Sequence, residues 1–205
     1  MTAVTIIGAG NMGTAIAGMA ARGGNTVQVL TKDPQKASAA IPAATHGTVG
    51  EPITGEIVIL AVPYGAVAGV LSQYEGLLEG KVIVDITNPV DFATFDSLVV
   101  PVDSSAAQVI AARLPGSSVL KAFNTTFAAT LSSGTVGGQR TTVLITGDDA
   151  GAKAALARVI EAGGLRAVDA GSLRRAHELE ALGFLQLSLA AGNKTSWTSG
   201  FVLAE

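Results

Sequence analysis

Three glycines with the spacing G-x-G-x-x-G follow a short apolar run near the start of the chain, at Gly8, Gly10 and Gly13. Between a strand and a helix, this spacing is typical of a loop that holds the pyrophosphate of a dinucleotide. Gly8 would permit the tight turn, Gly10 would let the backbone approach the phosphates, and Gly13 would let the helix pack on the sheet. The helix start would offer free N–H groups to the phosphates. The motif predicts a dinucleotide-binding loop, with a plain strand-to-helix turn as the alternative.

The residues after the second expected strand bear on the choice between NAD and NADP. An acid at this point would accept the ribose hydroxyls of NAD. Asp33 precedes Pro34, however, and this pair suits the cap and first turn of the next helix. Thr31 and Lys32 then offer a hydroxyl and a cation to a 2′-phosphate, and Lys36 adds a charge one turn later. We favour NADP(H) over NAD, with a solvated surface role for Lys32 as the alternative.

Two further strand ends carry candidate cofactor-binding residues, because ligands of open α/β sheets sit outside the carboxyl ends of the strands. Val62, Pro63 and Tyr64 close one strand, and the ring of Tyr64 could pack on ribose or adenine. Asn88 and Pro89 follow the next strand, where the amide suits a carboxamide or ribose and the proline stiffens the turn. A helix start at Pro63 and a ligand-free turn at Asn88 are the structural alternatives.

Asn124 and Thr125 follow the strand after that, and they put polar groups where a nicotinamide would reach. An ordinary polar turn explains these two residues equally well. Trp197 and Phe201 near the C-terminus could wall a pocket, although core packing or an oligomer interface is the favoured interpretation for them. The strand ends therefore predict a cofactor site built from several separate turns.

The ionisable residues form no recognisable catalytic set, so we assign no catalytic residue. His46 and His177 are expected at the surface, and Asp85 is expected as a buried, hydrogen-bonded acid within a strand. Lys121 also falls within a strand, where an edge position or a stem reaching to solvent is the default. No metal-ligand cluster and no nucleophile–base pair is visible in the sequence.

Composition excludes several classes of protein. The 205 residues carry a net charge of −3, with 14% charged and 48% hydrophobic residues, so no long-range field favours nucleic acid or an anionic membrane. The chain has no cysteine, which excludes disulfides and thiolate chemistry. No apolar run reaches the roughly 18 residues of a membrane span, and no signal peptide is visible. We expect a cytoplasmic protein.

Apolar runs and amphipathic or alanine-rich segments alternate along the chain. Strands are expected at Val4–Ile7, Thr26–Leu30, Ile57–Val62, Val82–Ile86, Val119–Phe123, Thr142–Thr146 and Arg166–Asp169, with helices between them and from Ala176 to Ala191. This alternation predicts an α/β fold of the Rossmann type, doubly wound around a mostly parallel sheet with helices on both faces. We expect one domain over 1–205, with a C-terminal helical segment at about 172–205 and a surface loop over Ser132–Arg140.

Taken together, the motifs resemble the NADPH-dependent reductases of the deazaflavin coenzyme F420, and the dinucleotide-binding domain of six-transmembrane metalloreductases. The resemblance rests on the stretches "IGAGNMG", "VILAVPY", "VDITNP", "SSAAQVIAARLP", "VLKAFNT" and "VDAGSLRRAHELEALG", which run along nearly the whole chain. The last two are more specific than the glycine motif. Two departures concern the acceptor and the cofactor: Asn124 stands where some F420 reductases have a histidine, and Lys32 stands where a basic pair is frequent.

The resemblance implies a set of cofactor contacts and a chemistry. It implies that Asn11 and Met12, with the motif glycines, bind the pyrophosphate, and that Thr31 and Lys32 bind the 2′-phosphate. It places Pro63, Asn88 and Asn124 near the ribose and nicotinamide, and Ala128 at a backbone contact to the carboxamide. Hydride would pass directly between NADP(H) and F420 or a flavin. Positioning is then the main task of the protein, which agrees with the missing acid–base set.

Two other functions stay open at this point. One is a non-catalytic NADP(H)-binding sensor or regulatory module, since no substrate domain is visible. The other is a reductase of small imines or carbonyls whose pocket is completed by a second subunit. We expect a homodimer, because the apolar segment from Ala176 onward offers more apolar surface than one helix face needs.

Overall fold

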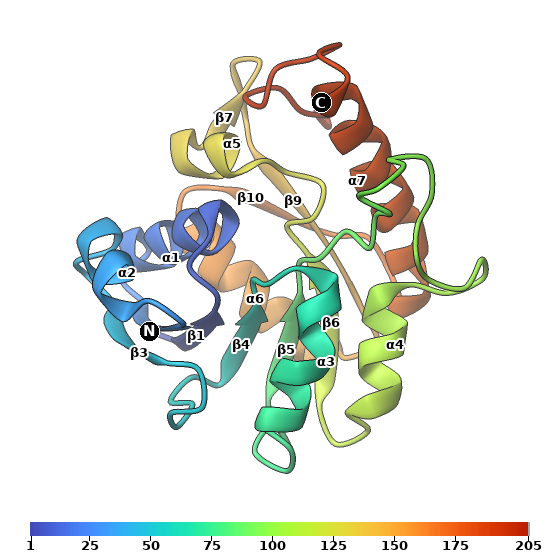
Figure 1. Cartoon of the computed structure of the whole chain (residues 1–205). Helices are drawn as coiled ribbons and strands as arrows, with labels where there is room; N and C mark the ends of the chain where they lie inside the picture. Colours follow the sequence, from blue (N-terminus) through green and yellow to red (C-terminus); the bar gives the residue numbers. More distant parts are fainter. Residues whose placement is uncertain (205) are drawn as a thin grey trace.

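The computed structural model describes residues 1–204 and is built around an eight-stranded sheet (Figure 1). The strand order is β10-β9-β6-β5-β4-β1-β2-β3. The strands are β1 (Ala3–Ile7), β2 (Thr26–Thr31), β3 (Thr45–Thr48), β4 (Ile57–Leu60), β5 (Val82–Asp85), β6 (Ser118–Ala122), β9 (Thr142–Gly147) and β10 (Arg166–Asp169). The part from β3 to β6 has the order 3-2-1-4-5-6 of dinucleotide-binding folds. The predicted Rossmann-type, doubly wound fold is confirmed.

Strand direction decides which strand ends meet. Neighbouring strands from β3 through to β6 are parallel, whereas β9 pairs antiparallel with β6, and β10 is parallel to β9. The carboxyl ends of β1, β2, β4, β5 and β6 therefore share one edge of the sheet, and those of β9 and β10 lie at the other. The chain leaves β1 toward β2 and later returns to β4, so the topological switch point lies between β1 and β4.

Helices cover both faces of the sheet, which explains why β4 is buried at every position. One apolar core joins the sheet to α1 (Asn11–Arg22), α2 (Pro34–Ala40), α5 (Ala128–Ser133) and α6 (Ala150–Ala162). The other joins it to α3 (Tyr64–Gln73), α4 (Ala106–Arg113) and the start of α7 (Ala176–Ala191). A 3-10 turn, Leu173–Arg175, leads into α7. No helix among residues 1–204 is long and apolar enough to cross a membrane.

The glycine motif has a packing role that the structure makes explicit. Gly8 has a φ of +110°, and a Cβ atom there would run into the carbonyl group of Ala61. A Cβ atom on Gly13 would in turn run into the carbonyl oxygen of Gly8. The loop after β1 is therefore folded tightly against the end of β4, which is the close packing expected for this motif.

Two expectations about local structure were wrong. The segment Ser132–Arg140 is not a plain surface loop, since it contains the end of α5 and a hairpin of β7 (Thr135–Val136) and β8 (Gln139–Arg140). Gly137 and Gly138 both have positive φ, as a two-residue hairpin turn requires. The C-terminal segment is helical only as far as Ala191, and residues 192–204 have no regular secondary structure.

Candidate functional site

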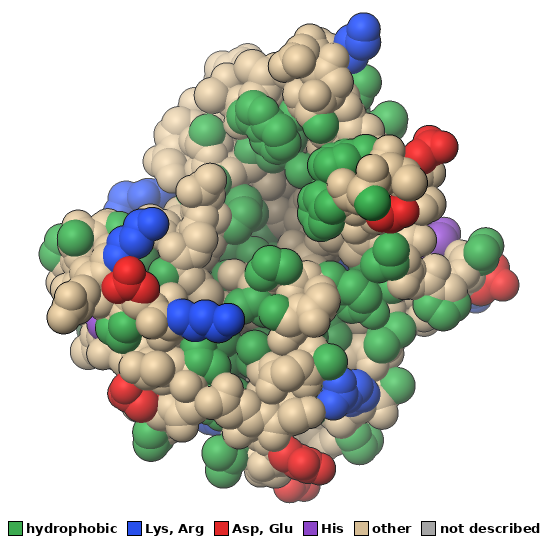
Figure 2. Space-filling view, viewed as in Figure 1, with side chains coloured by type: hydrophobic (Ala, Val, Ile, Leu, Met, Phe, Trp, Pro, Cys, Tyr) green, Lys and Arg blue, Asp and Glu red, His purple; other side chains and the backbone are tan. Residues whose placement is uncertain are grey.

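A cavity of about 970 Å³ opens at the shared carboxyl ends of the strands. Its walls come from the loop after β1 with α1, from α2, from the turns after β5 and β6, from α5, and from α7 with the segment beyond it. Figure 2 shows the hollow ringed by apolar side chains, with lysine and arginine side chains toward α1 and α2. Gly10, Asn11, Met12, Asn88, Asn124 and Ala128, all predicted cofactor-binding residues, line this one cavity.

The N-terminus of α1 has no side-chain cap, and the same holds for α3, α5 and α7, whereas side chains cap α2, α4 and α6. Asp33, Ser105 and Asp149 accept hydrogen bonds from the first turns of α2, α4 and α6. At α1 the N-cap residue is Gly10, and no side chain accepts from the helix start. The first N–H groups of α1 therefore remain available to an anion beside the cavity.

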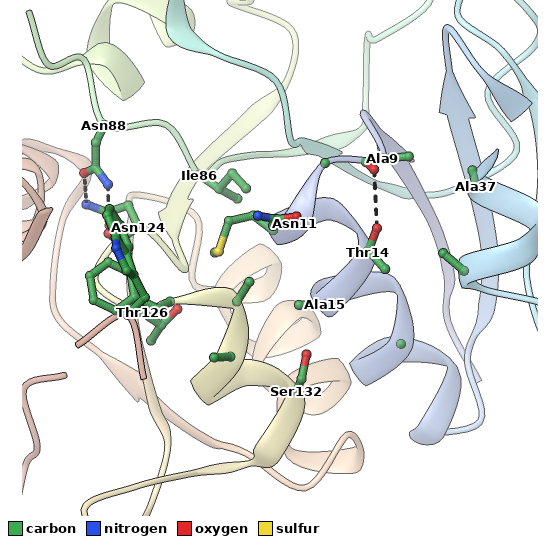
Figure 3. Close-up of a pocket in the computed structure, with 18 of the residues that line it drawn as sticks. Ala9, Asn11, Thr14, Ala15, Ala37, Ile86, Asn88, Asn124, Thr126 and Ser132 are labelled. Atoms are coloured by element: carbon green, nitrogen blue, oxygen red, sulfur yellow. Dashed lines mark hydrogen bonds between the residues drawn. The ribbon is translucent and has the colours of Figure 1, made fainter. Parts of the chain in front are cut away.

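Asn88 and Asn124 form a mutual pair on one wall, and Figure 3 shows the two amides facing each other. The Nδ2 of Asn88 donates to the carbonyl oxygen of Asn124 at 2.9 Å, and the Nδ2 of Asn124 donates to the Oδ1 of Asn88 at 3.0 Å. The Nδ2 of Asn124 also donates to the carbonyl oxygen of Leu179 in α7 at 2.7 Å. Because backbone carbonyls only accept hydrogen bonds, both amide orientations are fixed.

This geometry leaves one acceptor without a donor. The Oδ1 of Asn124 is buried and has no hydrogen-bond partner, and the whole residue is only 5% exposed. An unsatisfied buried acceptor costs about 1–3 kcal/mol. A ligand N–H that reaches this atom from the cavity would supply the missing donor. A primary carboxamide carries such an N–H.

Gly183 in α7 allows the helix to approach the asparagine pair, and the sequence analysis did not single it out. A Cβ atom at this position would collide with the Oδ1 of Asn88 and would lie 2.8 Å from the carbonyl oxygen of Asn124. The signal was present in the stretch "HELEALG", where a glycine interrupts a helix of otherwise strong helix formers. The reason for it is visible only in three dimensions.

Behind the asparagine pair lies a buried charge cluster made of Asp85, Lys121 and Glu180, each with a fully buried side chain. The ammonium of Lys121 donates to the Oδ2 of Asp85 at 2.7 Å, to the Oε1 of Glu180 at 2.7 Å and to the carbonyl oxygen of Thr87 at 2.6 Å. All three of its protons are therefore used. The expectation of a buried Asp85 is confirmed, and the expectation that Lys121 lies at an edge or reaches solvent was wrong, because β6 is an inner strand.

The cluster carries two carboxylates against one ammonium, and α4 offsets the excess charge. The Oε2 of Glu180 accepts the backbone N–H of Ala106 at 2.9 Å, at the positive end of that helix. Burial raises the pKa of Glu180, while Lys121 and the N–H of Ala106 act in the opposite direction. Burial, followed by the charges of Glu180 and Asp85, also raises the pKa of Tyr64, so its phenol stays protonated at neutral pH.

The residues proposed for the 2′-phosphate lie near α2. Asp33 caps α2 by accepting from the N–H of Lys36 at 3.0 Å, which confirms the structural role inferred for it. Thr31 is 9% exposed and Lys32 is exposed, and neither is among the lining residues. Lys36 and Arg22 do line the cavity. The contact of Thr31 and Lys32 with a 2′-phosphate stays a prediction.

The other predicted residues lie outside the lining of the main cavity. Gly8 and Gly13 lie in the tightly packed loop after β1. Val62, Pro63 and Pro89 are not among the residues that line the cavity. Tyr64 borders a separate cavity of about 190 Å³ between α3 and α4. A role for these residues in cofactor binding therefore stays a prediction.

Trp197 lies on the wall of the main cavity, which was the less favoured of its two interpretations. Its ring packs against Phe127, with the ring centroids 5.1 Å apart. Phe127 precedes α5 and is 8% exposed, whereas Trp197 is 52% exposed. The segment after α7 thus folds back over the turn that follows β6 and places an aromatic ring on the wall of the cavity that the asparagine pair also lines.

Comparison with known proteins identifies the family. The profile of the family described as "NADP oxidoreductase coenzyme F420-dependent" matches residues 3–89. The F420-dependent NADP reductase of Methanothermobacter marburgensis is 30% identical over an alignment of 209 positions, and the alignment covers 91% of this chain and 91% of that protein. The chain belongs to the F420-dependent NADP reductase family. NADP(H) and coenzyme F420 are the cofactor and substrate after which this family is named.

Two further comparisons support the assignment to the F420-dependent NADP reductase family. A protein of Arthrobacter sp. FB24, proposed to be an F420-dependent NADP reductase, has a solved structure with a TM-score of 0.87 at 25% identity, over 100% of both chains. The metalloreductase STEAP3 of Rattus norvegicus is 30% identical over 184 residues, covering 87% of this chain. The chain spans only 36% of the length of that metalloreductase.

The buried cluster generates a prediction about stability and pH. Lys121→Met leaves Asp85 and Glu180 as buried carboxylates without a counter-ion, which costs about 3–5 kcal/mol at neutral pH. The pKa of Glu180, which burial already raises, then rises further because Lys121 no longer lowers it. The native state therefore binds more protons than the unfolded state, and stability falls as pH increases. Urea unfolding should show a larger deficit relative to wild type at pH 8 than at pH 5.

Lys153→Met is the matched control, because it removes the same charge from the partly exposed pair with Asp169. We expect a loss of no more than about 1 kcal/mol for this variant. A deficit for Lys121→Met that is the same at both pH values would contradict the buried, charged state of the cluster.

Proposed function

We propose that this chain binds NADP(H) in the main cavity and transfers hydride between the nicotinamide ring and a deazaflavin or flavin-like acceptor. The observation that carries the proposal is that one cavity is lined both by Asn124, whose buried Oδ1 has no partner, and by the uncapped start of α1. One end of the cavity therefore offers an acceptor for a carboxamide N–H, and the other offers backbone donors for phosphates.

The placement of the dinucleotide follows from these two ends. The pyrophosphate would lie against Gly10, Asn11 and Met12 at the start of α1, where Gly8 and Gly13 shape the loop. The nicotinamide would lie beside Asn88 and Asn124, with the backbone of Ala128 in reach of the carboxamide. Such a course runs across the switch point between β1 and β4, where open α/β sheets bind their ligands.

The charge of the lining residues favours transfer between two rings. Arg22 and Lys36 are the charged side chains on the cavity wall within residues 1–204, and the lining holds no carboxylate and no histidine. Oxidation of a hydroxy acid needs a general base for the hydroxyl proton. NADP(H), when bound, supplies the hydride, and the protein then has only to hold donor and acceptor carbons about 3–3.5 Å apart.

The predicted residues Val62, Pro63, Tyr64 and Pro89 fit this proposal as neighbours of the strand ends that carry the cofactor. We also retain two proposals that concern the whole chain: that residues 1–205 act as a single NADP(H)-binding domain, and that the chain is a homodimer. The exposed Leu185 of α7 and the exposed Phe201 beyond it supply apolar surface for the second.

An acceptor survey tests the proposed reaction. NADPH oxidation is followed with F420, FMN, FAD, a ferric chelate and a cyclic imine in turn, with NADH in parallel. We expect turnover with F420 or a flavin, and Asn124→Ala should lower kcat/KM about tenfold or more, because one buried hydrogen bond to the carboxamide is lost. Tight NADPH binding without turnover of any acceptor would contradict hydride transfer and favour the sensor.

The 2′-phosphate proposal is tested by two lysine substitutions. Lys32→Ala and Lys36→Ala should each weaken NADPH about fivefold or more and leave NADH unchanged, because only NADPH carries the 2′-phosphate charge. Dissociation constants measured by fluorescence titration give the NADPH-to-NADH ratio for each variant. Lys153→Met is the control, because Lys153 forms its ion pair with Asp169 of β10. This variant should leave both affinities unchanged. Equal weakening of NADPH and NADH by Lys32→Ala would exclude a phosphate contact there.

A further inference from the structure

The charge cluster of Asp85, Lys121 and Glu180 is a costly way to fill the space between the sheet and α7. Replacing a buried ion pair by apolar side chains of similar volume is frequently neutral or stabilising. In this chain every proton of the Lys121 ammonium is satisfied, and Glu180 also accepts from two backbone N–H groups of α4. A network this complete fixes positions rather than adding stability.

The positions that it fixes are next to the asparagine pair. Glu180 adjoins Leu179, whose carbonyl oxygen accepts the amide N–H of Asn124 at 2.7 Å. Lys121 precedes Asn124 by three residues, on the strand that leads into that turn. On the other side, Asp85 accepts the N–H of Thr87 at 2.9 Å, immediately before Asn88.

The ion pair between Lys121 and Glu180 therefore holds α7 at a set height above β6. At this height the glycine at position 183 allows the helix to touch the asparagine pair, where a Cβ atom would collide. The carbonyl of Leu179 can only accept, so it turns the Nδ2 of Asn124 toward α7. The same rotation leaves the Oδ1 as the atom without a partner.

We propose that Lys121 and Glu180 are positioning residues, which orient the Asn124 amide for the nicotinamide by fixing α7 against the sheet. This inference rests on the proposed function, since it concerns the same cavity. It adds that the affinity for the nicotinamide half depends on an ion pair that contacts neither cofactor nor acceptor. The adenosine half, near α1 and α2, is independent of this ion pair.

The test is a double-mutant cycle read with two ligands. The variants are Glu180→Gln, Asn124→Ala and the double substitution, and the ligands are NADPH and adenosine 2′,5′-bisphosphate, which lacks the nicotinamide. Glu180→Gln removes the charge facing Lys121, and its amide cannot accept at both of the former carboxylate contacts. Calorimetric titration gives all affinities without any assumption about the acceptor.

We expect Glu180→Gln to weaken NADPH about fivefold or more and to leave the bisphosphate within about twofold of wild type. Asn124→Ala should show the same selectivity, and the double variant should bind NADPH no more weakly than Asn124→Ala alone, because coupled residues do not contribute additively. Additive losses, or equal weakening of both ligands by Glu180→Gln, would overturn the inference.

Gly183→Ala reaches the same geometry without touching the charges, and it serves if Glu180→Gln does not fold. It pushes α7 away from the pair, so we expect the same selective loss of NADPH affinity; unchanged NADPH binding would contradict the inference. Ser105→Ala is the matched control, because it removes the other cap of α4 and leaves Lys121 and Glu180 paired. It should lower Tm and leave both affinities unchanged.

Failure of this inference is distinguishable from failure of the proposed function. If the wild-type protein binds NADPH no more tightly than the bisphosphate, then the nicotinamide half adds nothing to the binding affinity, and both proposals are contradicted. If the wild type shows that gain but the cycle is additive, the cofactor site stands and only the positioning role of Lys121 and Glu180 is overturned.

Discussion

The ammonium of Lys121 joins the parts of the molecule that form one end of the cavity. It bonds to β5 through Asp85, to the following turn through Thr87, and to α7 through Glu180. A lone buried cation would be expensive, and two carboxylates alone would repel each other. The three charges are therefore stable only together, and their mutual dependence sets the spacing between the sheet and α7.

The cavity has two chemically different ends, and this asymmetry matches a dinucleotide. At the start of α1 the backbone N–H groups are free. Lys36 of α2 and Arg22 in the last turn of α1 also line the cavity. At the turns after β5 and β6, an amide pair of fixed orientation contains a buried acceptor without a partner. Phosphates suit the first environment and a carboxamide suits the second. Among residues 1–204, the lining holds no carboxylate and no histidine.

Much of this arrangement was predictable from sequence, because it depends on local signals. Continuous apolar runs predicted the inner strands, and the glycine spacing predicted the loop after β1. The Asp33–Pro34 pair predicted the start of α2. Fixed backbone rules govern each of these features. The grouping of Asn88 with Asn124 followed from a single topological rule, that parallel strands end at one edge.

The remainder depended on contacts between distant residues. A lysine within a strand, such as Lys121, is interpreted from sequence as an edge or surface residue unless its counter-ions are known. The two counter-ions of Lys121 lie 36 and 59 residues away in the sequence. The purpose of Gly183 appears only when α7 is docked on the asparagine pair. The hairpin of β7 and β8, by contrast, carried its signal in the glycine pair at 137 and 138, which favours a two-residue turn.

A crystal structure of the protein with NADP⁺ tests the central claim most directly. The account predicts that the carboxamide nitrogen of the nicotinamide lies within about 2.7–3.2 Å of the Oδ1 of Asn124, while the Nδ2 of Asn124 still faces the carbonyl of Leu179. A nicotinamide bound elsewhere, or an Asn124 amide turned so that its oxygen faces α7, would contradict it.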